Sequence, residues 1–192
     1  MPAPPTDTPP TLVEETIGRD AAVVPGTVFE RCTFAATRLA GADLAGCRFV
    51  DCRFEGADLS DAAVHEVVLQ GTEFRDCKLL GVDFTHAARL TAVVFERCVL
   101  DHCAFDGMDL RHLVLRDSRA REALFSGADL SEAVLAGTDL TGARFGRTNL
   151  GGADLRRATG YALDPLDDRL RGAKVSLPEG AALLASLGIV VE

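Results

Sequence analysis

Large apolar residues recur at every fifth position along most of this chain. Leu or Phe occupies 24 of the 26 central positions between Phe29 and Leu155, and these positions hold all ten Phe residues. A small residue, usually Ala, Cys, Thr or Val, stands two places before the central residue at 24 of the 26 places, with Met108 and Leu113 as the exceptions, and polar residues and Gly dominate the remaining places. A period of five matches neither the period of about 3.6 residues of a helix nor the alternation of a strand.

The pattern predicts an all-β fold in which the chain turns once per repeat and four repeats close a square coil. The large and small apolar residues then point inward, and Gly suits turns that require positive φ. Coils stacked at about 4.8 Å pair their backbones, so we expect a right-handed quadrilateral β-helix. Side chains about one coil apart should form columns: Phe34, Phe54, Phe74 and Phe95 in one, and Phe84, Phe105, Phe125 and Phe145 in another.

One extra residue interrupts the five-residue frame between Thr85 and Arg89. We therefore expect two solenoid subdomains, residues 21–84 and 90–157, separated by a frame break at 85–89. Residues 1–20 are expected to form a flexible N-terminal arm. Residues 158–192 are expected to form a C-terminal cap and dimerisation element.

The sequence after the repeats predicts a short helix followed by a strand. Ser176 and Glu179 have the S-x-x-E spacing of a helix capping box. The apolar stretch Ala181–Leu187 predicts the helix, and Ile189–Val191 predicts the strand. Such a unit covers the open end of a solenoid or pairs with a second chain. The residues expected to make the dimer contact are Leu183, Leu184, Leu187, Ile189 and Val190.

Composition and charge narrow the range of partners. The formal net charge of −9 argues against general binding of nucleic acid or of an anionic membrane. The N-terminus lacks the basic and apolar regions of a secretory signal, and the most apolar stretch, residues 181–191, is too short to span a bilayer. We therefore expect a cytoplasmic protein.

The cysteines and histidines, which often act in catalysis or bind metals, occupy positions that the repeat assigns. All six cysteines occupy the small inward position, at spacings that match no zinc pattern, so we expect free thiols. His65 and His86 fall on adjacent coils near Glu66 and Asp106, which leaves a surface metal site open beside the simpler interpretation of solvated histidines. A filled core provides no pocket for a nucleophile. We expect no enzymatic activity, no metal and no cofactor. All four histidines take outward positions: His65, His86, His102 and His112.

The repeat, written small, Asp or Asn, Leu or Phe, any residue and Gly, resembles the signature of the pentapeptide-repeat family over about residues 27–155. Residues 161–165 (YALDP), 172–173, 176–179 and 183–189 resemble the tail of the Qnr-type quinolone-resistance members. Many Qnr-type proteins project loops from the coil, whereas this frame admits no insertion beyond one residue.

The resemblance implies a dimeric rod that is similar to DNA in size and charge. Such proteins bind DNA gyrase or topoisomerase IV and either modulate the enzyme or protect it from a poison, which confers antibiotic tolerance or self-resistance. Because the repeat itself carries no information about the partner, a generic interaction scaffold with an unrelated protein partner is the alternative.

Charge is unevenly distributed over the predicted faces. Residues 27–157 contain 20 acidic and 16 basic side chains, a net charge of −4. The face built on Leu44, Val64, Phe84 and Phe105 has no Lys or Arg until Arg144. This face, which carries only acidic charges over that stretch, is either an ordinary solvated surface or a surface that contacts a basic DNA-binding site. Its acidic residues are Asp43, Glu66, Asp83 and Asp106.

Overall fold

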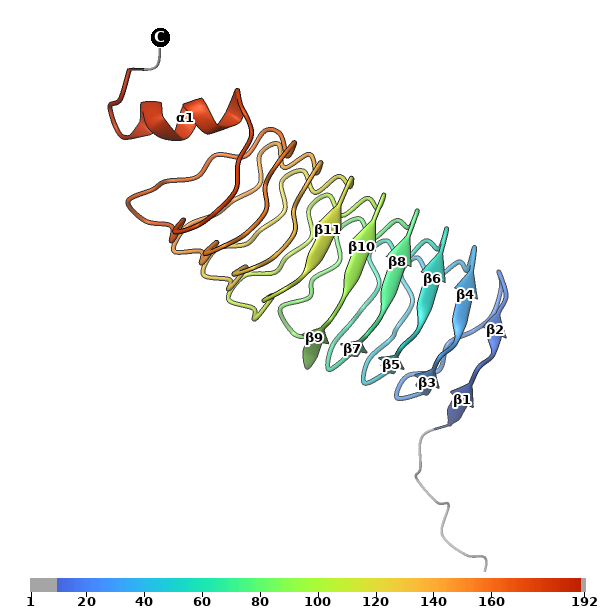
Figure 1. Cartoon of the computed structure of the whole chain (residues 1–192). Coiled ribbons are helices and arrows are strands. Elements are labelled where there is room, and N and C mark those ends of the chain that lie inside the picture. The colour runs from blue at the N-terminus through green and yellow to red at the C-terminus, as the bar shows by residue number, and fades with distance from the viewer. Residues whose placement is uncertain (1–9, 191–192) are drawn as a thin grey trace, which may run out of the picture.

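The chain forms one coiled rod with a helix across its C-terminal end (Figure 1). The computed structural model describes residues 10–190. Its elements are β1 (Thr11–Val13), β2 (Thr16–Ile17), β3 (Val28–Glu30), β4 (Thr33–Ala35), β5 (Arg48–Val50), β6 (Arg53–Glu55), β7 (Val68–Gln70), β8 (Glu73–Arg75), β9 (Arg89–Thr91), β10 (Val94–Glu96), β11 (Val114–Arg116) and α1 (Glu179–Ser186). The architecture is the right-handed quadrilateral β-helix that the repeat predicts.

Two faces of the rod are parallel sheets. Sheet one has the order β1-β3-β5-β7-β9, and sheet two has the order β2-β4-β6-β8-β10-β11. Phe34 aligns with Phe54 and Phe54 with Phe74, so one coil is built from four repeats as predicted. Isolated parallel bridges such as Asp58 to Lys78 join the coils on the other faces.

The columns of inward side chains fill the interior. Side chains are buried at 24 of the 26 central positions, and those of Leu90 and Phe145 are half-buried. The predicted Phe columns are present: ring centroids are 4.3 Å apart between Phe34 and Phe54 and 5.0 Å between Phe84 and Phe105. The enclosed void beside these rings measures about 10 Å³, no larger than one water molecule needs.

The N-terminal boundary differs from the predicted arm. Residues 11–17 form β1 and β2, which pair with β3 and β4, so the solenoid begins inside the segment expected to be flexible. Leu12 aligns with Phe29, although the two are closer in the sequence than Phe29 and its next partner Phe49. Because this first coil is shorter than the others, a search for a strict five-residue frame does not detect it. Residues 1–9 of the predicted arm lie outside the described residues.

The C-terminal end confirms the predicted helix but not its cap or the strand. Residue Pro178 precedes α1, and no side chain caps the helix, so the box predicted from Ser176 and Glu179 is absent. Ser176 Oγ instead accepts a hydrogen bond from the Arg157 N–H at 3.2 Å. Ile189 and Val190 are not in a strand, and Val191 lies outside the described residues. No helix among residues 10–190 has the length and apolarity to cross a membrane.

The frame break is a β-bulge at Ala88. Ala87 takes the inward position, because its N–H donates to Phe84 O at 2.9 Å as in regular coils. The N–H groups of Ala88 and Arg89 then both donate to Val67 O, at 2.9 and 3.3 Å. Two residues thus oppose one on the neighbouring coil, which defines a bulge. Ala88, which the frame assigned to the small inward position, is exposed.

Candidate partner-binding surface

The four predicted carboxylates share one face of the rod. Asp43 bridges to Ala63 and Asp83 to Ala104, and the Glu66 N–H donates to His86 O at 2.9 Å. These contacts join successive coils, so Asp43, Glu66, Asp83 and Asp106 lie in sequence along the rod. We define the acidic face as the outward residues of the segments centred on Leu44, Val64, Phe84, Phe105 and Phe125.

Backbone hydrogen bonds hold three of these carboxylates in place. Asp43 Oδ1 accepts from the Ala45 N–H at 3.0 Å. Asp83 Oδ1 accepts from the N–H and the hydroxyl of Thr85, at 2.9 and 2.5 Å. Asp106 Oδ1 accepts from the Ser126 N–H on the next coil at 2.9 Å. Their charges are therefore fixed by the turns of the coil.

No Lys or Arg pairs with the carboxylates of the acidic face in the described part of the chain. Their nearest ionisable partners are histidines: Glu66 lies 3.8 Å from His65, and Asp83 lies 3.6 Å from His86. Burial opposes ionisation of Asp83, but the hydrogen bonds from Thr85 and the nearby His86 outweigh it and lower the pKa of the Asp83 carboxyl. Asp83 therefore keeps its negative charge at neutral pH.

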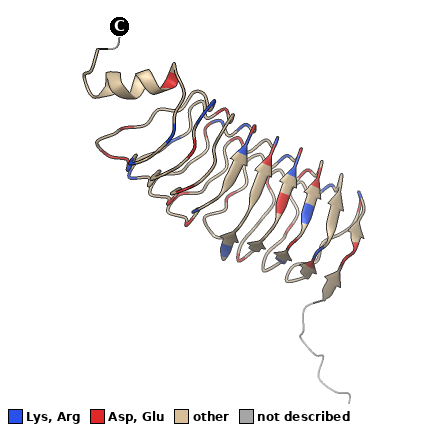
Figure 2. Ribbon diagram, in the orientation of Figure 1, with Lys and Arg blue, Asp and Glu red and all other residues tan. Residues whose placement is uncertain are grey.

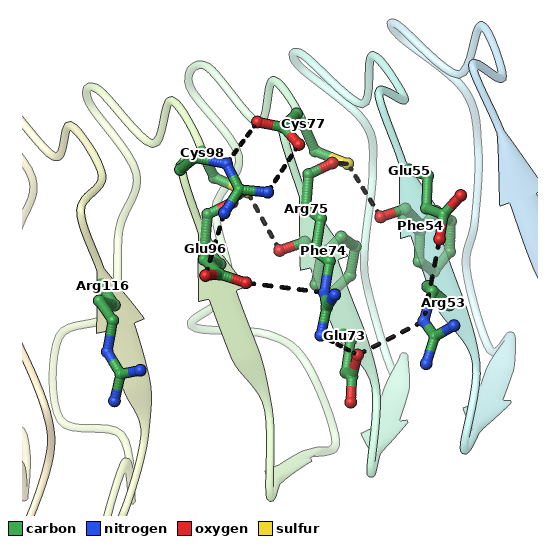
Figure 3. A network of polar contacts seen from close by, with 12 residues as sticks. Arg53, Phe54, Glu55, Glu73, Phe74, Arg75, Cys77, Glu96, Cys98 and Arg116 are labelled. Atoms are coloured by element: carbon green, nitrogen blue, oxygen red, sulfur yellow. Dashed lines mark hydrogen bonds and ion pairs between the residues drawn. The ribbon is translucent and has the colours of Figure 1, made fainter.

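Sheet two presents the opposite arrangement. Glu73 lies 3.4 Å from Arg53 and 3.2 Å from Arg75, which in turn lies 3.6 Å from Glu96 (Figure 3). Basic and acidic positions alternate along these strands (Figure 2). We define the ladder face as the outward residues of sheet two from β6 to β11. Its charged side chains between β6 and β11 are Arg53, Glu55, Glu73, Arg75, Asp76, Glu96, Arg97 and Arg116.

The tightest pair on the ladder face joins two coils. Arg97 Nε and Nη2 donate to the two carboxylate oxygens of Asp76 at 2.8 and 2.9 Å. This hydrogen bonding lowers the pKa of Asp76 and raises the pKa of Arg97. Exposed ion pairs of this kind stabilise a fold only slightly. Their main effect here is to cancel the charge of the ladder face.

Cations follow beyond the C-terminal end of the acidic face, on the next segment, which is centred on Phe145. Arg144 bridges to Leu124, and the Arg147 N–H donates to Asp167 Oδ2 at 2.9 Å. Neither guanidinium is within ion-pair distance of a carboxylate among residues 10–190. The uncompensated negative charge thus covers the part of this face from Asp43 to Asp106.

The predicted dimer residues do not all share one environment. Leu183 packs against the core, whereas Leu184, Leu187 and Ile189 are 41%, 47% and 48% exposed, and Val190 is 82% exposed. Of the exposed members, Leu184 lies in α1, and the others lie on the chain that follows it. An apolar patch therefore remains at this end, without the contribution expected from Leu183.

The cysteines and histidines lie where the repeat places them. All six cysteines are buried free thiols, and burial raises the pKa of Cys52 to about 11 and of Cys103 to about 12. The side chains of His65 and His86 are 63% and 66% exposed, with ring centroids 6.0 Å apart. Within residues 10–190, no group of three or more His, Cys, Asp or Glu side chains is placed to hold a metal ion.

Two features of the surface are absent from the sequence-based predictions. The first is the ion pairing on sheet two: its alternating charges were visible in the sequence, but which of them pair depends on the register of the coils. The second is the groove beside Ala88, described below, whose position depends on where the extra residue enters the coil. The spacing of one full coil between Arg53 and Glu73 was the available signal for the first feature.

Comparison with solved structures identifies similar rods. A trypsin-treated variant of QnrB1, a plasmid-mediated fluoroquinolone resistance protein, is 26% identical, with a TM-score of 0.67 over 96% of this chain and 98% of that chain. A second trypsin-treated variant is 26% identical, with a TM-score of 0.63 over the same shares. Full-length QnrB1 is 24% identical, with a TM-score of 0.56 over 94% of this chain and 98% of that chain. No curated protein sequence matches the chain.

Family models match most of the solenoid. A model described as a pentapeptide repeat region matches residues 27–101. A second, described as pentapeptide repeats in eight copies, matches residues 88–127 and 121–157. The two models together cover the stretch over which the five-residue frame was found, and the chain therefore belongs to the pentapeptide-repeat family.

Proposed function

We propose that this protein binds a type II topoisomerase, DNA gyrase or topoisomerase IV, through its acidic face, and that it modulates the enzyme or protects it from a poison. The observation that carries the proposal is the row of carboxylates from Asp43 to Asp106, which no Lys or Arg neutralises within the described residues. The similarity to QnrB1, a fluoroquinolone resistance protein, supports the choice of target.

The spacing of charge indicates how the rod replaces DNA. Duplex DNA carries one charge per about 1.7 Å of its axis. The acidic face carries about one carboxylate per coil, and coils are separated by about 4.8 Å. The face is thus less highly charged than DNA, and binding combines the shape of the rod with partial charge mimicry. Charge complementarity mainly accelerates association and selects the partner.

The decisive experiment measures gyrase supercoiling and drug-induced DNA cleavage with the purified protein. In the test variant, Asp43, Asp83 and Asp106 become Asn, and Glu66 becomes Gln. The matched control neutralises four carboxylates of the ladder face instead: Glu55→Gln, Glu73→Gln, Asp76→Asn and Glu96→Gln. Both variants lose four negative charges, so only the location of the charge differs.

We expect the native protein and the control to reduce drug-induced cleavage while supercoiling continues. The test variant should require at least tenfold more protein for the same effect. If native protein changes neither activity of gyrase or of topoisomerase IV, the topoisomerase proposal is wrong. If both variants lose the effect equally, net charge and not the acidic face is responsible.

A generic scaffold is the second candidate, and the low charge of the solenoid favours it. The net charge of residues 27–157 is only −4, from 20 acidic and 16 basic residues, and most carboxylates outside the acidic face pair with Arg. Affinity capture from a cell lysate distinguishes the two candidates. Recovery of topoisomerase subunits, dependent on the acidic face, supports the first, and recovery of an unrelated protein supports the scaffold.

We also propose that two copies associate through α1 and the residues after it. The exposed side chains of Leu184, Leu187 and Ile189 form the apolar patch that a second copy would cover. Sedimentation velocity tests this with Leu187→Glu, and Leu166→Glu is the control, because Leu166 is 84% exposed elsewhere. Dissociation to monomers by Leu187→Glu alone supports the dimer, and a native protein that sediments as a monomer excludes it.

A further inference from the structure

The bulge at Ala88 opens the rod on the side of sheet one. Sheet one ends at β9, although the coils continue to the C-terminal cap. Elsewhere, hydrogen bonds connect each coil to the next. Within the described chain, no backbone hydrogen bond connects residues 85–92 to residues 106–112. The edge of β9 is therefore free in the middle of the solenoid.

The alternation of a parallel strand shows which backbone groups are free. The N–H of Arg89 and the C=O of Thr91 both bond to the coil of β7. The N–H and C=O of Leu90, between them, must then point to the other side of the strand. No group among residues 10–190 bonds to them on that side. An exposed strand edge of this kind is a template for pairing with another chain.

A groove of about 540 Å³ lies beside this edge. Leu90 and Met108 contribute apolar surface, and both are half-buried against the core. Ala88 and Gly107 form part of its walls and leave space because their side chains are small or absent. Met108 is a large residue at a position where the repeat prefers a small one. It fills part of the space that opens where the coils separate.

The groove is continuous with the acidic face. Thr85, which bonds the Asp83 carboxylate, and Asp106 both line the groove. Asp106 has no Lys or Arg partner within the described residues. Asp109 also lines the groove, but its carboxylate forms an ion pair with Arg111 at 2.7 Å. Arg89 is the one cation among the lining residues. A ligand that enters from the acidic face therefore meets a free carboxylate first.

We propose that the groove binds an extended segment of the partner protein, which adds a strand to the edge of β9 and places a Lys or Arg beside Asp106. Identifying this partner as a topoisomerase rests on the function proposed above. Main-chain hydrogen bonds to Leu90 supply affinity that does not depend on sequence. The contact with Asp106 supplies the preference for a basic side chain. The groove thus adds a peptide site to a surface that otherwise acts through shape and charge.

A defined probe tests the groove without a topoisomerase. The probe is a fluorescein-labelled nine-residue peptide of alternating Lys and Val, and a peptide of alternating Glu and Val is its control. Native protein should bind the Lys peptide at least tenfold more tightly than the Glu peptide. Hydrogen exchange should show at least tenfold slower exchange at the Leu90 amide in the complex. A native protein whose Leu90 amide the Lys peptide does not protect would overturn the proposal.

Deletion of Ala88 is the sharpest variant, because it restores the regular frame and lets β9 pair with the following coil. Affinity for the Lys peptide should fall at least tenfold, while circular dichroism and the melting temperature show an intact fold. If the deletion impairs folding, Ala88→Trp replaces it as the test. This substitution fills the groove from an exposed position and should cause the same loss of peptide affinity. Undiminished peptide binding by a folded blocked variant contradicts the proposal, since the peptide then binds only the acidic face.

The same variants on gyrase separate the two proposals. If native protein protects gyrase and the deletion variant does not, the groove takes part in the topoisomerase contact. If both protect equally, the groove is not used in this contact, while the proposed function stands. If native protein binds the Lys peptide in the groove but does not affect gyrase or topoisomerase IV, the peptide site stands and the topoisomerase proposal fails.

Discussion

The acidic face and the ladder face are built from the same repeat on the same core, yet they present opposite electrostatic surfaces. On the ladder face, Glu73 lies between Arg53 and Arg75, and Asp76 pairs with Arg97. On the acidic face, the carboxylates from Asp43 to Asp106 meet only backbone donors, Thr85 and histidines. The number of acidic residues on a solenoid face therefore does not measure its potential. The pairing between neighbouring coils decides it.

The comparison also separates stability from recognition. Exposed ion pairs contribute little stability because water screens them. The ion pairs of the ladder face thus leave that side of the rod electrically neutral. The acidic face keeps a net negative charge, which can guide a basic partner from a distance. The predictions below test this division, from the largest expected effect to the smallest.

The largest effect should come from the core, and it should be the same beneath both faces. Phe54 lies under the ladder face and Phe105 beside the acidic face, and each is 0% exposed. Either Phe→Ala substitution should lower the free energy of unfolding by about 3–5 kcal/mol, because it leaves a cavity in a stacked column. Urea denaturation measures the loss. A loss below about 1 kcal/mol at one site alone would show that the two faces do not share one core.

Salt should affect the two faces differently. Raising the salt concentration from about 50 to 200 mM should slow association of the native protein with gyrase at least tenfold, which corresponds to about 1.4 kcal/mol. Stopped-flow or surface plasmon resonance measures the rate. The variant whose acidic-face carboxylates are neutralised should lose most of this dependence, and the variant whose ladder-face carboxylates are neutralised should keep it. Equal salt dependence in both variants would contradict the division of roles.

Acid should weaken the ladder side of the rod through Asp154. Hydrogen bonds from Arg156 lower the pKa of Asp154 to about 2, below the unfolded value of about 3.9. A lowered folded pKa means that the stabilisation is present above about pH 4 and is lost as the pH falls towards 2. Asp154→Asn should therefore cost about 1 kcal/mol at pH 6 and almost nothing at pH 2. Urea titrations at both pH values test this, and a cost independent of pH would exclude the charge as its cause.

The smallest effect should show a conflict between stability and charge on the acidic face. Glu66 has φ of 56°, a left-handed conformation that is unfavourable for a residue with a side chain. Glu66→Gly should raise the free energy of unfolding by about 0.5 kcal/mol, because Gly removes this strain but adds freedom to the unfolded chain. The same substitution should weaken gyrase binding. Ala36→Gly, at φ of 48°, is the control, which should stabilise the fold without weakening binding.

Most of the solenoid was predictable because the period of five reflects one local geometry repeated many times. Leu and Phe at the central positions and Cys or Ala two places earlier predicted the core, and the Phe columns predicted the stacking. The first coil was missed because the spacing between Leu12 and its partner Phe29 is not a multiple of five. The capping box failed because Ser176 bonds the backbone of Arg157 on the solenoid instead of the helix.

The candidate surface was predictable in part. The sequence places Asp43, Glu66, Asp83 and Asp106 on one face, because the frame assigns each residue to a side of the square. Their lack of cationic partners required the coordinates, since a long Arg side chain reaches across coils and faces. Arg121, for example, bonds Asp139 on the next coil at 2.7 Å. Spacing alone does not reveal which such contacts form.

The sequence by itself determined the coil, its inward residues and the face on which each charge lies, because these follow from a local turn geometry repeated with every pentapeptide. The tertiary structure alone decided which charges cancel, where the solenoid begins and how the extra residue is accommodated. These outcomes depend on contacts between neighbouring coils, which are distant in the sequence, and there side-chain reach and a single bulge outweigh the repeat. The free edge of β9 is the clearest case, because one added Ala removes the hydrogen bonds between coils along one side of the rod.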